Sequence, residues 1–108
     1  MNGLLGNVNI TTTGLTKVYT VPADTYTVLV LNICNRSTST QAIKVAIADG
    51  TDIVTDADYI EYDTDVFANN VLERTGIVLN ADQRLIIQAT GTPSLTATVW
   101  GLETSTVV

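Results

Sequence analysis

Residues 26–35 read YTVLVLNICN, the most apolar stretch of this 108-residue chain. Leucine or isoleucine occupies positions 29, 31 and 33, and Val28, Val30 and Cys34 alternate with them, so an extended segment here is apolar on both faces. In a small antiparallel protein such a strand must be covered twice. One cover is the protein's own core. The second is either a loop of the same chain or another subunit, and the sequence leaves both alternatives open.

Turn signals divide the rest of the chain into short extended segments, which is typical of a β-sandwich. Thr, Val and Ile make up 41 of the 108 residues, and such β-branched side chains favour strands over helices. The sequence therefore predicts an all-β protein: a single antiparallel β-sandwich or jelly-roll-like domain of about eight strands. The expected strands are residues 10–13, 16–21, 26–35, 41–48, 59–62, 71–79, 84–90 and 95–102.

The length is that of one domain, and we expect residues 10–103 to form the sandwich. Residues 1–9, with two Gly and three Asn, are predicted to be a loose N-terminal arm, and residues 104–108 a C-terminal tail. Removing residues 1–9 should then leave a folded domain. The apolar residues of these ends are candidate contacts with other chains: Leu4, Leu5, Val107 and Val108.

Trp100 is predicted to point away from the core. In residues 95–102 the apolar positions 95, 97 and 99 form one face, and Trp100 stands with Thr96 and Thr98 on the other. An outward tryptophan is typical of an interface anchor, or it is covered by loops of its own chain. With Val28 and Val30 it completes the set of candidate interface residues.

The charge balance excludes several classes of partner. The net charge is −6 with only five basic residues, which disfavours a nucleic-acid-binding protein. No apolar run approaches the 18 residues that cross a membrane, so we expect no membrane partner. Only 15% of the residues are charged, well below the usual quarter, and the surface is therefore either neutral or covered by neighbours.

The sequence offers little for catalysis. It has no His, the usual general base near neutral pH and the commonest metal ligand. Cys34 lies in the most apolar segment, where a thiol is usually inert. Glu61 and Asp63, two apart on an expected strand, would share a face as a glycosidase pair could, although such pairs are more often solvated. We expect no enzyme activity, no catalytic residue and no cofactor.

Four aspartates gather in one expected loop: Asp49, Asp52, Asp56 and Asp58. Clustered carboxylates are what Ca²⁺ coordinates, but their spacing does not fit the EF-hand pattern. A solvated acidic loop is the expectation, and these four residues are the candidates for the alternative, a structural cation site.

Several segments carry a resemblance: VYTVPA from Val18, NICNRS from Asn32, DYIEYD from Asp58, LERTGIVL from Leu72 and VWGLE from Val99. Together, over residues 17–103, they resemble a small β-sandwich module of tailed-bacteriophage virion proteins, including those of cyanobacterial phages. Related modules tend to have Gly where this chain has Asp24, which leaves that turn open. Thr75–Gly76 is expected to bend or bulge its strand.

The resemblance implies a structural role without catalytic residues. The leading expectation is a capsid decoration (cement) protein on the outer surface of the virion, made in the host cytoplasm. It would assemble as a homotrimer and bind the major capsid protein or other virion proteins. The alternative is a tail, collar, baseplate or fibre-associated protein, in which host glycan could be a ligand.

Overall fold

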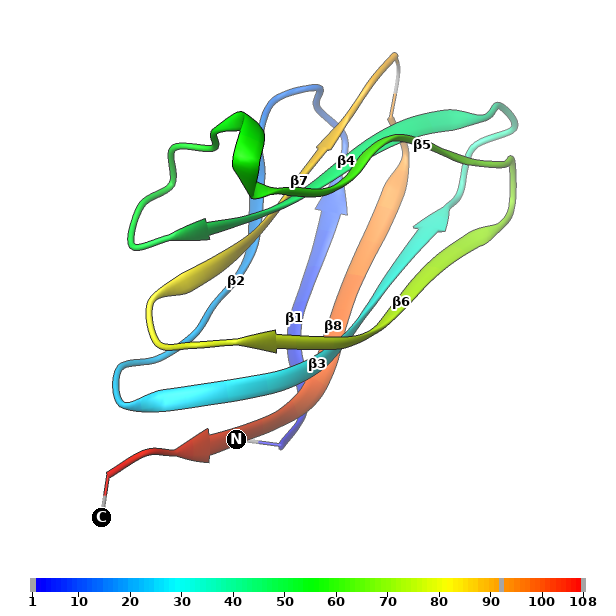
Figure 1. Ribbon diagram of the computed structural model, residues 1–108. Helices are drawn as coiled ribbons and strands as arrows, with labels where there is room; N and C mark the ends of the chain where they lie inside the picture. Colours follow the sequence, from blue (N-terminus) through cyan, green and yellow to red (C-terminus); the bar gives the residue numbers. More distant parts are fainter. Residues whose placement is uncertain (1, 92, 108) are drawn as a thin grey trace.

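The computed structural model describes residues 2–91 and 93–107, which fold into eight strands and one 3-10 turn (Figure 1). The expected all-β sandwich is confirmed. The elements are β1 (Asn2–Ile10), β2 (Thr16–Thr20), β3 (Thr25–Asn35), β4 (Gln41–Asp49), η1 (Asp56–Asp58), β5 (Tyr59–Val66), β6 (Val71–Leu79), β7 (Gln83–Ala89) and β8 (Leu95–Ser105).

The strands form two four-stranded sheets, in the orders β1-β8-β3-β6 and β2-β7-β4-β5, and every pair is antiparallel. This interleaved order is that of a jelly roll, in which consecutive strands lie in opposite layers except for the β4–β5 hairpin. Figure 1 shows the layers facing each other, with β8 and β3 in the middle of one sheet and β7 and β4 in the middle of the other. We call them the 1-8-3-6 sheet and the 2-7-4-5 sheet.

The core lies between the sheets and is built by the predicted alternation. In β3 the side chains of Leu29, Leu31 and Ile33 are at most 1% exposed. The same inward positions of β4, β7 and β8 are also buried, as one-face-in strands require. These residues form one continuous cluster, which includes Ile43, Val45, Leu85, Ile87, Leu95, Ala97 and Val99.

The N-terminal arm prediction is wrong. Residues 2–9 belong to β1, which pairs with β8 from Asn2 opposite Leu102 to Ile10 opposite Leu95. Gly and Asn are poor strand formers, but at position 6 the packing of β1 requires a glycine. A Cβ on Gly6 would lie 2.7 Å from the backbone oxygen of Val18, so glycine lets β1 approach β2 of the opposite sheet.

The predicted C-terminal tail is also partly sheet. β8 continues to Ser105, and the backbone N–H of Thr106 donates to the carbonyl of Asp24 at 2.8 Å. Asp24 itself has φ 54°, the left-handed conformation that glycine adopts most easily, so this chain forms its turn despite the aspartate. The bulge expected at Thr75–Gly76 is confirmed, because Gly76 has φ 71° where the β3–β6 register shifts.

Candidate interaction surface

The outward face of the 1-8-3-6 sheet carries two neighbouring rows of apolar side chains. In the first row, Leu4 of β1 and Val30 of β3 lie directly opposite Trp100 of β8. In the second row, Leu102 of β8 and Val78 of β6 lie opposite Val28 of β3. Directly opposed residues of antiparallel strands point to the same side, about 5 Å apart at Cβ, so each row is a continuous apolar band.

These side chains are not covered by the chain. Val28 is 40% exposed, Trp100 is 37% exposed and Val78 is 61% exposed. Tyr26 extends the same face one step further along β3 and is 38% exposed. We call the exposed residues of this surface the apolar face: Leu4, Tyr26, Val28, Val78, Trp100 and Leu102.

The apolar face answers one question that the sequence left open. No loop among residues 2–91 and 93–107 covers Val28 or Trp100, since each of the two side chains stays more than a third exposed. Of the alternatives weighed for residues 26–35, covering by a loop of the same chain is excluded for Val28. A second cover for Val28 would have to come from another molecule.

The predicted interface residues divide into three groups. Leu4, Val28, Val30 and Trp100 come together on the outward side of one sheet. Leu5 does not join them, because it sits at the β1 bulge and packs against the core. Val107 is 66% exposed beyond the end of β8, away from these rows, and Val108 lies outside the described residues.

Leu102, Val78 and Tyr26 were not predicted. Leu102 follows Trp100 by two positions and Tyr26 precedes Val28 by two, so a longer count of the alternation would have found both. The side on which Val78 lies could not be predicted, because the bulge at Gly76 interrupts the alternation of side chains along β6. The strand register shows that Val78 lies opposite Val28, on the outward side.

A loop does cover the outer side of the other sheet. Ala46, Ala48 and Ile86 point away from the main core, yet each is at most 2% exposed. The loop of residues 50–58, which contains η1, lies over β4 in Figure 1 and packs against it. We call it the covering loop. Ile86 lies opposite Ala46 on this same side of the sheet, so its burial here and not in the main core breaks the alternation of β7.

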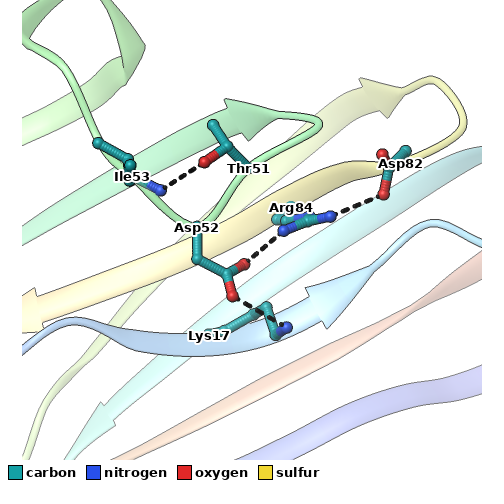
Figure 2. A network of polar contacts seen from close by, with 6 residues as sticks. All are labelled: Lys17, Thr51, Asp52, Ile53, Asp82 and Arg84. Carbon is teal, nitrogen blue, oxygen red and sulfur yellow. Dashed lines mark hydrogen bonds and ion pairs between the residues drawn. The ribbon is translucent and has the colours of Figure 1, made fainter.

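Ion pairs hold the covering loop in place (Figure 2). Asp52 accepts hydrogen bonds from Arg84 at 2.8 Å and from Lys17 at 3.5 Å, two cations of neighbouring strands. Arg84 also donates to Asp82 at 2.9 Å. The hydrogen bond from Arg84 is the main cause that lowers the pKa of Asp52 below its usual value. Asp52 is therefore a structural anion.

We predict that Asp52→Asn loosens the covering loop. Amide hydrogen exchange in residues 50–58 should become about two- to fivefold faster, as expected for losing an exposed ion pair. Because the pKa of Asp52 is lowered in the folded protein, wild type should show the same loosening as pH falls below the usual value of 3.8. Asp56→Asn, which removes a charge from the same loop, is the control. Equal exchange rates in the two variants would contradict the role of Asp52.

The other candidate metal ligands are separated. The Asp58 carboxylate accepts from the backbone N–H and the side chain of Thr55 and so caps η1, while Asp49 and Asp56 are exposed. Among the residues that the structure describes, no group of three or more His, Cys, Asp or Glu side chains is placed to hold a metal ion.

The expectation that Glu61 and Asp63 share a face is wrong. A bulge in β5 sets Val45 opposite Glu61 but Ile43 opposite Thr64, and Asp63 takes φ 53° within it. Glu61 accepts from Arg74 of β6 and thereby links the free edges of the two sheets. Asp63 instead pairs with Lys44.

Tyr19 and Glu103 form a partly buried pair between the sheets. The Tyr19 hydroxyl donates to the Glu103 carboxylate and lies 2.8 Å from the hydroxyl of the buried Thr27. Burial, together with the nearby carboxylate, raises the pKa of Tyr19 to about 12. The hydrogen bond from Tyr19 lowers the pKa of Glu103.

Tyr19→Phe is expected to lower the free energy of unfolding by about 1–2 kcal/mol at neutral pH, because Glu103 loses the hydrogen bond from the Tyr19 hydroxyl. The raised pKa means that Tyr19 stabilises the fold fully below pH 10 and loses this effect as pH rises towards 12. The unfolding temperature of wild type should therefore fall towards that of Tyr19→Phe as the pH rises from 10 to 12. The exposed Tyr62→Phe should keep the wild-type profile, and a gap between wild type and Tyr19→Phe that persists at pH 12 would contradict the assignment.

No protein-family model matches this chain, and no curated protein matches it significantly. None of the described residues forms a helix long and apolar enough to cross a membrane, and their surface holds no pocket. Among the described residues, the exposed apolar face is the surface feature that indicates an interaction with another molecule.

Proposed function

We propose that this protein is a non-enzymatic structural component of a bacteriophage virion, a capsid decoration protein on the outer surface of the head. The observation that carries the proposal is the apolar face, because a contiguous exposed patch of this kind marks a protein–protein contact. The role is consistent with a small jelly roll, an architecture used by viral capsid proteins among others. Fold alone does not assign function, so the proposal also rests on the sequence resemblance over residues 17–103.

The charge distribution suits an outer position. A chain with net charge −6 is repelled by a packaged genome but is tolerated on the outside of a shell. A decoration protein needs no chemistry: it stabilises the head by burying surface across the joints between capsid subunits. Each 1.4 kcal/mol of interface energy changes its occupancy about tenfold.

Counting the copies of this protein in purified particles tests the proposal. Hundreds of copies per particle are expected for a decoration protein that binds the repeated lattice of the major capsid protein. A few to a few tens of copies would instead place it in the tail, collar, baseplate or fibre. Absence from washed particles would overturn the structural role altogether.

A further inference from the structure

We propose that the apolar face is covered by a second copy of this chain. The inference rests on the proposed structural role and names the partner of this surface. Its members are between 37% and 61% exposed, and together they span a patch on the order of several hundred Å², the size at which exposed apolar patches mark interaction sites. A standard interface needs roughly 800 Å² from each partner, which the patch and its polar margin can supply.

The apolar face lacks charge in a strongly acidic protein. No charged side chain of the described residues stands within its two rows. On this side of the sheet, Glu73 lies opposite Asn32, beyond the row of Trp100, and Arg36 follows the end of β3. The cations Lys17, Lys44 and Arg84 all pair with aspartates that belong to the other half of the sandwich.

This arrangement favours an identical partner over a charged one. A basic partner would gain nothing from a face without carboxylates. Two copies placed face to face bury apolar side chains against apolar side chains and desolvate no charge at the centre of the contact. An apolar surface can also pair with the same surface of a second copy, as an isologous contact between identical subunits requires. The net charge of −6 on each copy then opposes association only at long range, where salt screens it.

Sedimentation of the full chain across about 1–100 μM, at about 0.05 M and about 0.5 M NaCl, tests the inference. We expect a dimer that becomes tighter at the higher salt concentration. The chain has one tryptophan, and it lies in the apolar face, so the emission of Trp100 should shift to the blue as the oligomer forms. A monomer at every concentration and salt would overturn the inference, as would an oligomer in which Trp100 stays as accessible to a soluble quencher as in the monomer.

Val28→Lys places an unpaired charge in the centre of the contact and should weaken association by about a hundredfold or more. Phe67→Lys is the matched control, because Phe67 is 61% exposed outside the apolar face and the net charge changes equally. Both variants retain Trp100, and thermal unfolding verifies that each is folded. Equal weakening by the two variants would contradict the proposed interface. A monomeric chain present in hundreds of copies per particle would overturn the pairing and leave the structural role standing.

Discussion

Gly101→Ala is expected to destabilise the fold by about 3 kcal/mol or more, because overpacking in a position that cannot yield is among the costliest single changes. Gly101 lies in β8, opposite Leu29 of β3 and Gly3 of β1. A Cβ at this position would stand 2.1 Å from the carbonyl oxygen of Val28 and 2.8 Å from the Cα of Leu29. Both contacts are with the backbone of a central strand, which cannot rotate away as a flexible side chain would.

Thermal or urea unfolding measures this effect. A loss of about 3 kcal/mol corresponds to roughly 15 °C in Tm for a domain of this size. Gly14→Ala is the matched control, since a Cβ there meets nothing within 4 Å and φ is not positive, so its effect should be neutral or slightly stabilising. A Gly101→Ala protein that unfolds within about 2 °C of wild type would show that β3 and β8 tolerate the extra carbon.

Most of the strands could be predicted because their alternation is local. The expected strand of residues 71–79 coincides with β6, and those of residues 26–35 and 41–48 match β3 and β4 within one residue at each end. Period-two patterning and turn residues determine such segments without knowledge of their partners. The fold class follows from these segments, but the order of strands within each sheet does not.

The errors arose where a distant part of the chain decides the local structure. The polar, glycine-rich residues 2–9 form a strand because β8 supplies hydrogen-bond partners and β2 leaves room only for glycine at Gly6. Ile86 is buried outside the core, on the side of the sheet where the covering loop packs against the neighbouring β4. The bulge at Asp63 reverses a side chain that simple alternation places beside Glu61. The residues immediately before and after each of these positions in the sequence do not indicate these contacts.

Only part of the apolar face could be predicted, because strand pairing, unlike alternation, is not local in the sequence. Val28, Val30 and Trp100 could be found because each lies on a regular strand whose inward side was already evident. Their meeting with Leu4 depends on β1 being in the sheet, and the meeting with Val78 depends on the register across the Gly76 bulge. Alternation assigns a side chain to a face, but only the pairing of strands brings separate faces together into one surface.

Deleting residues 1–9 is expected to destabilise the domain severely rather than merely weaken its attachment to a partner. The deletion removes nearly all of β1, including Leu5 and Val8, which pack against the core. It also takes away the hydrogen-bonded neighbour of β8 from Thr96 to Leu102. β8 then becomes an exposed edge strand, a common site of aggregation, and the inward Val99 loses cover on its flank.

We expect this truncation to lower the free energy of unfolding by about 3 kcal/mol or more, or about 15 °C in Tm, and to promote aggregation on heating. Removing residues 107–108, which lie beyond the end of β8, is the matched control and should leave Tm nearly unchanged. Circular dichroism and urea unfolding of the two truncations decide the matter. If the chain without residues 1–9 unfolds as cooperatively and at the same denaturant concentration as wild type, β1 contributes little to the sandwich and residues 1–9 act as an arm after all. If it unfolds at a lower denaturant concentration, any loss of particle binding by that truncation reports on the loss of the fold and not on the loss of an attachment arm.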